Sequence, residues 1–383
     1  MRFALTVLGW AALVLGTPAL GAPPNPPVTA PPAVAASPPP ATDPDAVLKL
    51  IRTAMQDIIA NDRPGAADTL DRALAIVEST HGAGPEAAKA RSLWYEEGCK
   101  IFKGEPYERC MMYYYRGLLY LWKKDYGNAH ACFANGILQD AFAEEEQDQC
   151  DFGLLYFLSV YTASLSGQNA QDDEKDLARL RPDAPKIGKD GAVLVICETG
   201  KAPRKLSDGV GHYELKFFRG KNFRSVRARL KLADGTTLNA YPMEDIAFQA
   251  MTRGSRPIDF ILEHKAQFRE NTSIAGSTLS TAATAAILAS TVVSKGAGTL
   301  QIAGGAMEVA SALLQMAASA SKPQADVRTW DNLPDTVHVA LVDPALARQG
   351  ITVEFLAADG SVVASTELKA DPDSNVLWCR NSD

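Results

Sequence analysis

Several motifs that would identify an enzyme are missing from this chain of 383 residues. It has no Gly-x-Ser-x-Gly nucleophile elbow and no complete Gly-x-x-x-x-Gly-Lys-Ser/Thr phosphate loop. Its five histidines are scattered and it has no Cys-x-x-Cys pair, so a metal site is not expected. The sequence therefore predicts a protein that is not an enzyme, with no cofactor and no small-molecule substrate.

Basic residues are fewer than acidic residues in this chain. The chain has 38 Lys and Arg against 45 Asp and Glu, a net charge of −7, which argues against nucleic acid as a partner. One segment departs from this average, because seven cations and no acid occur between residues 216 and 231. They are Lys216, Arg219, Lys221, Arg224, Arg227, Arg229 and Lys231.

The last three of these cations alternate with apolar residues, so we expect them on one face of a strand. Two interpretations stay open. The charges could protect an exposed strand against edge-to-edge pairing. Alternatively, the seven residues form a patch for an anionic ligand, such as a wall polymer, an acidic polysaccharide, lipid head groups or an acidic protein. Binding of that kind would weaken with salt.

The first 22 residues are typical of a secretory signal peptide, with an N-terminal membrane anchor as the alternative. A single basic residue, Arg2, precedes an apolar run that ends in small residues around Ala19 and Gly21. Residues 23–43 follow as a linker rich in proline and alanine, which favours an extended conformation. We expect an exported protein, periplasmic or secreted, with membrane association as a further option.

Cysteine is infrequent, with six in the chain, but export would permit disulfides. Cys99 and Cys110 flank a loop of ten residues that a disulfide could close. Cys197 and Cys379 both lie in strand-like runs, so a bond between them could join the two ends of one sheet. Buried free thiols are the alternative.

Residues 44–181 carry apolar positions at helical spacing. In the second half of this region, small and aromatic residues alternate on two successive helices, with a turn at residues 123–125. The positions are Gly117, Tyr120, Ala129, Phe133 and Gly136. They resemble the small and large positions of the tetratricopeptide repeat family.

A weaker match to the same family occurs earlier, at Ala54, Ala66, Leu70 and Ala73. The two units are offset by 63 residues (Ala66 to Ala129) instead of the 34 that the family uses. The resemblance therefore implies a divergent helical bundle.

In that family, the first helix of each hairpin offers its concave face to peptides. The corresponding residues here are Met111, Tyr114, Leu118, Leu121 and Trp122. Such an apolar face is unfavourable in water. Either other helices of the chain cover it, or it is a groove for an apolar partner helix.

Residues 182–383 change character, with seven or eight short β-type runs bounded by turn residues. They predict a β-sandwich-like domain, interrupted by a long helical insertion at about residues 243–322. Within the insertion, residues 271–321 hold only two charges, Lys295 and Glu308, among many small residues. This segment could be a hairpin packed against protein, a segment that associates with or inserts into a membrane, or a mobile segment.

The fold class expected is thus α+β. The turn that contains Asp326, Arg328, Trp330 and Leu333 resembles one in exported bacterial proteins that pair tetratricopeptide-like helices with a β-rich domain. The resemblance implies a protein–protein interaction or assembly scaffold of the cell envelope, with protein partners that the sequence does not name. The alternatives are an anionic-polymer or lipid-head-group binder acting through residues 216–231, and membrane-associated assembly through residues 271–321.

Overall fold

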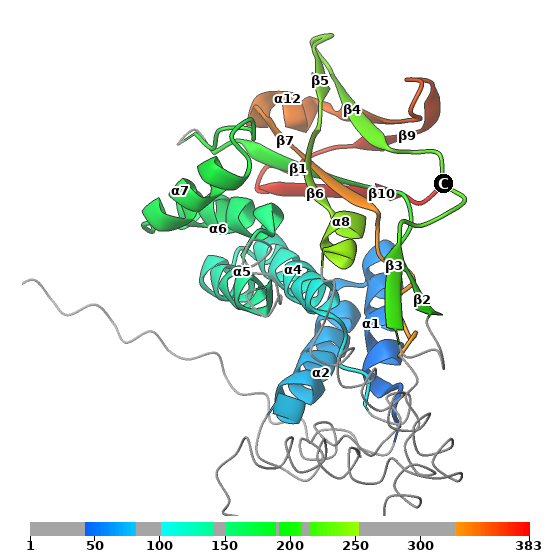
Figure 1. The fold of residues 1–383 in the computed structure, drawn as a ribbon. Coiled ribbons are helices and arrows are strands. Elements are labelled where there is room, and N and C mark those ends of the chain that lie inside the picture. Colours follow the sequence, from blue (N-terminus) through cyan, green and yellow to red (C-terminus); the bar gives the residue numbers. More distant parts are fainter. Residues whose placement is uncertain (1–42, 82–100, 141–149, 189–190, 209–213, 253–325) are drawn as a thin grey trace, which may run out of the picture. The chain divides into compact units, whose positions relative to one another are not determined.

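Helices come first along the chain and strands follow, as expected for an α+β protein (Figure 1). The computed structural model describes residues 43–81, 101–140, 150–188, 191–208, 214–252 and 326–383. All of these belong to one compact unit, residues 36–383. The predicted signal peptide, most of the linker and residues 271–321 lie outside the described residues, and so does most of the predicted insertion.

The described helices are α1 (Ala46–Ile59), α2 (Arg63–His81), α4 (Pro106–Trp122), α5 (Tyr126–Asp140), α6 (Gly153–Ser166), α7 (Gln171–Leu180), α8 (Ile246–Met251) and α12 (Pro344–Gln349). The described strands are β1 (Val193–Thr199), β2 (Arg204–Asp208), β3 (Glu214–Phe218), β4 (Arg227–Leu232), β5 (Thr237–Asn239), β6 (Tyr241–Asp245), β7 (Thr336–Val342), β8 (Ile351–Leu356), β9 (Val362–Leu368) and β10 (Val376–Asn381).

Two helical hairpins form where the small residues predicted them. Helix α4 starts with Pro106 and a reciprocal capping box between Glu105 and Glu108, which satisfies free backbone N–H groups. It turns at residues 123–125 into α5. A Cβ atom added to Gly117 would come within 2.3 Å of the Phe133 ring, so the glycine is what allows the two helices to approach.

The strands form two four-stranded sheets and a separate hairpin of β2 and β3. The first sheet has the order β10-β1-β7-β6, in which β10 runs parallel to β1 and the other pairs are antiparallel. The second sheet has the order β5-β4-β8-β9 and is antiparallel throughout. Strands β10 and β9 are thus each at the edge of their sheet.

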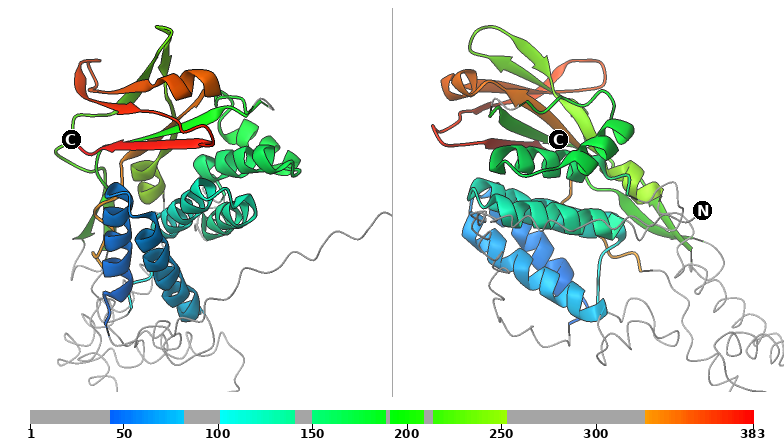
Figure 2. Two further views of the ribbon diagram at one scale, coloured as in Figure 1. Left: turned by 180° about the vertical axis from the view of Figure 1, so that it is seen from behind. Right: turned by 90° about the vertical axis from the view of Figure 1, so that its left-hand side faces the viewer.

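Strand β1 is buried along its whole length because both faces of the first sheet are covered (Figure 2). On one face, Leu194 and Ile196 share a core with helices α1, α2, α4 and α6. On the other face, Val193, Val195 and Cys197 share a core with the second sheet. This two-sided burial explains why the segment is a continuous apolar run.

Two expectations about strands need correction. Strand β4, with its alternating cations, lies between β5 and β8, so it is not an exposed edge strand. Strand β6 occupies residues where the helical insertion was predicted to begin. The sequence of β6 contains Pro242, which has no backbone N–H and suits its position at the edge of the first sheet.

Candidate functional site

The predicted groove on α4 is covered by the chain's own sheet. Met111, Tyr114, Leu118 and Leu121 are buried in the core that α4 shares with the first sheet, and Trp122 is half-buried. Of the two alternatives, the open groove is therefore wrong for the first four residues, and cover from within the chain is right for them. The apolar face is covered because the sheet, which periodicity in the helical half cannot reveal, packs against it.

The contact between α4 and the sheet centres on the buried carboxylate of Glu198 in β1. Its oxygen atoms accept hydrogen bonds from the hydroxyl groups of Tyr114 at 3.0 Å and Tyr115 at 2.9 Å, and from Trp378 Nε1 at 3.0 Å. The guanidinium of Arg380 lies 3.7 Å away. Burial raises the pKa of Glu198, while Arg380 and the three donors act in the opposite direction.

A second buried carboxylate, Glu108, ties the start of α4 to the β-rich half. It pairs with Lys205 Nζ of β2 at 2.7 Å and accepts from the backbone N–H of Trp330 at 2.8 Å. Both carboxylates have their charges and hydrogen bonds satisfied within the chain. Such networks hold elements in register.

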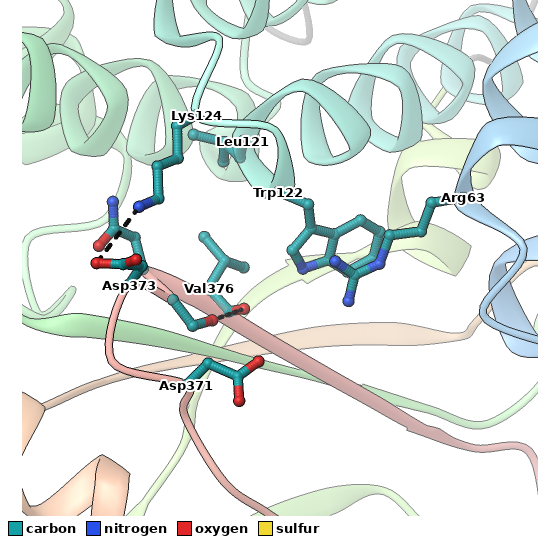
Figure 3. A pocket seen from close by; sticks show the side chains of 9 residues that line it. Arg63, Leu121, Trp122, Lys124, Asp371, Asp373 and Val376 are labelled. Atoms are coloured by element: carbon teal, nitrogen blue, oxygen red, sulfur yellow. Dashed lines mark hydrogen bonds and ion pairs between the residues drawn. The ribbon is translucent and has the colours of Figure 1, made fainter.

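An open cleft lies beside this contact, where the α1–α2 turn and the end of α4 approach β9, β10 and the loop between these strands. It has two adjoining parts, of about 190 and 360 Å³, which share Arg63, Trp122, Asp371, Ser374 and Val376. Figure 3 shows Val376 between Trp122 on one side and Asp373 on the other, with Asp371 below it in this view.

One wall of the cleft is a stacked pair. The guanidinium of Arg63, at the first position of α2, lies 4.3 Å from the ring centroid of Trp122 at the end of α4 (Figure 3). Burial lowers the pKa of Arg63, and the negative charge of Asp371 opposes this effect. The stack fixes both side chains and presents an aromatic edge with a cation beside it.

The opposite wall is the loop between β9 and β10. Asp373 of this loop forms an exposed ion pair, at 3.8 Å, with Lys124 of the turn after α4. The loop is held by Arg348, which donates to the Pro372 carbonyl at 3.0 Å, and by Asn375, which donates to the Tyr126 hydroxyl at 2.5 Å. The cleft thus has a fixed frame, apolar side chains and charges of both signs.

The predicted anionic-ligand patch is largely neutralised inside the protein. Six of its seven cations have partners within the chain. Lys216 pairs with Asp208, Arg219 with Asp245 and Asp335, Arg224 with Asp383, Arg229 and Lys231 with Glu354, and Arg227 donates to the carbonyls of Ala357 and Ala358. The common face of the β4 cations is confirmed. Glu354 on β8 lies directly opposite Arg229. Hydrogen bonds from Lys231 and Arg229 lower the pKa of Glu354.

The two predicted cysteine pairs have different outcomes in the structure. Cys99 lies outside the described residues, and Cys110 is a buried thiol that donates to the Gly136 carbonyl at 3.3 Å. Cys197 and Cys379 are neighbours on β1 and β10, as free thiols.

The described parts of the chain contain no group of three or more His, Cys, Asp or Glu residues arranged to hold a metal ion. None of the helices in the described ranges is both long enough and apolar enough to cross a membrane.

Comparison with known proteins gives no relative from which a function could be transferred. No protein-family model matches the chain, and no curated protein or solved structure is significantly similar to it. The resemblance to tetratricopeptide repeats therefore stays a prediction. Sequence reasoning found Leu121 and Trp122 of the cleft, but it missed Arg63, Asp371 and Val376, which carry no local motif.

Proposed function

We propose that this protein is an exported, non-catalytic scaffold of the bacterial envelope that holds a segment of a partner protein in the cleft between Trp122 and β10. In this proposal the helical half is a divergent tetratricopeptide-like bundle, and the two sheets form a sandwich-like domain. The single observation that carries the proposal is the cleft itself, with its rigid Arg63–Trp122 wall.

The composition of the cleft favours a protein partner. Tryptophan and arginine are the residues that most often dominate binding energy at protein interfaces. The cleft adds the exposed aliphatic side chain of Ile59 and a second tryptophan, Trp378. Strand β10 forms its floor and is an edge strand, so an extended segment could pair with it by strand addition. None of the described residues lining the cleft is a histidine or cysteine.

The two alternative functions have less support. Binding of an anionic polymer or lipid head groups through residues 216–231 would have to compete with the acids that already pair with most of these cations. Membrane-associated assembly depends on residues 271–321, which lie outside the described residues.

Photo-crosslinking tests the proposal. A photoreactive amino acid placed at Ile59, which is 57% exposed at the cleft, should give a discrete protein adduct in intact cells. Leu138 on α5 is a matched control, because it is a similarly exposed aliphatic residue at 59% and does not line the cleft. The same adduct from both positions, or none from Ile59, would contradict the proposal.

A charge reversal adds specificity to the test. Asp371→Arg alters one wall of the cleft at an exposed position, so the fold should be retained. We expect the Ile59 adduct to fall at least several-fold, while the melting temperature stays within a few degrees of the parent. A pull-down from envelope extracts tests the anionic-ligand alternative. That alternative is supported if the protein retains only polysaccharide or lipid and if salt removes this material.

A further inference from the structure

Two buried thiols lie side by side where the C-terminal strand joins the first sheet. Cys197 of β1 and Cys379 of β10 are directly opposite each other in the parallel register. Their Sγ atoms are 3.6 Å apart. Both side chains point toward the core between the two sheets, with exposed fractions of 0% and 7%.

The backbone geometry of this pair suits a covalent bond. Neighbouring strands are about 4.8 Å apart, and disulfides bridge Cα atoms separated by about 4.4–6.8 Å. Since the two residues are in register and on the same face, their Cβ atoms point the same way. Closing the sulfur separation to about 2.05 Å needs a movement of about 1.5 Å. Side-chain rotation supplies part of it and a small approach of the two strands supplies the rest, because Cβ atoms that point the same way stay about 4.8 Å apart and a disulfide needs about 3.5–4.5 Å.

We propose that Cys197 and Cys379 form a disulfide in the exported protein, which fixes β10 in the first sheet. One thiolate attacks the disulfide of an oxidised dithiol protein, forms a mixed disulfide and displaces one of that protein's thiolates. The second cysteine, as thiolate, then attacks its neighbour's sulfur and releases the other. The pair gives up two protons and two electrons, and the oxidising protein is reduced to its dithiol.

Burial determines when this exchange takes place. A sulfur with almost no exposed surface is out of reach of another protein's disulfide. The bond must therefore form while β10 is still docking on β1. Once formed, it closes a loop from residue 197 to residue 379 and holds Trp378 and Arg380 against Glu198. This inference rests on the export that is part of the proposed function, but not on the proposed partner binding.

Peptide mapping of the wild-type chain tests the bond directly. The full-length protein is exported to an oxidising compartment, denatured without reductant, treated with N-ethylmaleimide and digested with trypsin. Cys197 is the only cysteine of the tryptic peptide 190–201, and Cys379 is the only cysteine of peptide 370–380. We expect one linked species that reductant splits into these two peptides. Two separately alkylated peptides, or either peptide joined to another cysteine, would overturn the proposal.

Thermal unfolding tests the role of the bond. Reductant should lower the melting temperature of the wild-type protein by about 5 °C or more, because the closed loop is long. The double variant Cys197→Ala/Cys379→Ala should lose this response, while Cys132→Ala, a half-buried cysteine elsewhere, should keep it. An equal response to reductant in wild type and double variant would show that this pair does not fix the strand.

Discussion

At the scale of single residues, the buried carboxylate of Glu198 joins helix α4 to the first sheet. It accepts three side-chain hydrogen bonds from Tyr114, Tyr115 and Trp378, and it neutralises Arg380. Glu198→Ala would leave the two buried tyrosine hydroxyls without an acceptor, and would remove the partner of the partly buried Trp378 and Arg380. We expect a loss of about 3–5 kcal/mol in the free energy of unfolding, measured by urea denaturation.

The exposed Glu174 on α7 provides the control for this change, since Glu174→Ala should alter stability by less than about 0.5 kcal/mol. Equal effects of the two substitutions would show that the Glu198 network contributes little.

His338 on β7 makes stability depend on pH at the acid end. Its Nε2 atom lies 3.0 Å from the Thr199 hydroxyl, and burial lowers its pKa from 6.5 to about 4. Between these two values the unfolded chain binds a proton that the folded chain does not, so stability falls as pH decreases from 6.5 to 4. The pKa difference corresponds to about 3 kcal/mol for a fully titrated group.

We therefore expect the stability advantage of the wild-type protein over His338→Gln to shrink as pH falls from 7 to 4. Urea unfolding of both proteins at several pH values measures this difference, and it cancels the contributions of the carboxylates common to both. A difference that is constant with pH would mean that His338 titrates normally in the folded protein.

At the scale of elements, Gly117 tests the close crossing of α4 and α5. Alanine normally stabilises a helix interior relative to glycine, by about 1 kcal/mol. Here its Cβ atom would lie 2.3 Å from the Phe133 ring, so Gly117→Ala should instead destabilise the protein by about 1–3 kcal/mol. Gly127 at the start of α5 is a matched control with open space around it, and Gly127→Ala should be neutral or stabilising.

Thermal or urea unfolding distinguishes these outcomes, and stabilisation by Gly117→Ala would rule out the tight crossing. The hairpin was predictable because its determinants lie within 20 residues of one another, at a fixed helical spacing. Strand β4 shows the opposite case. Its alternation revealed which face is buried, but its central position depends on β8, more than 100 residues away, and no local pattern encodes that.

At the scale of the whole molecule, helices pack on one face of the first sheet and the second sheet packs on the other. The cleft was not predicted because its residues meet only in this assembled structure. Arg63, Trp122 and Asp371 come from regions of the chain separated by dozens to hundreds of residues. Only the docking of helices on the sheet brings them together. The open-groove alternative for α4 is wrong for the same reason, since the sheet that packs against this helix comes later in the chain.

The division predicted from the sequence, with a helical domain at 44–181 and a β-rich domain at 182–383, stays a prediction that unfolding can test. One core contains residues of both regions, such as Leu118 of α4 with Ile196 of β1. If this core makes the two regions one cooperative unit, Leu118→Ala should destabilise both by the same amount, at least about 2 kcal/mol.

Hydrogen exchange followed by mass spectrometry reads each region separately. In the Leu118→Ala protein, the slowest amides of α5 and of β8 should exchange faster by the same factor, about 30-fold for 2 kcal/mol. Faster exchange in α5 alone, with β8 unchanged, would show that the helices unfold independently, as two separate domains would. In that case the Glu198 network would join two domains that each fold on their own.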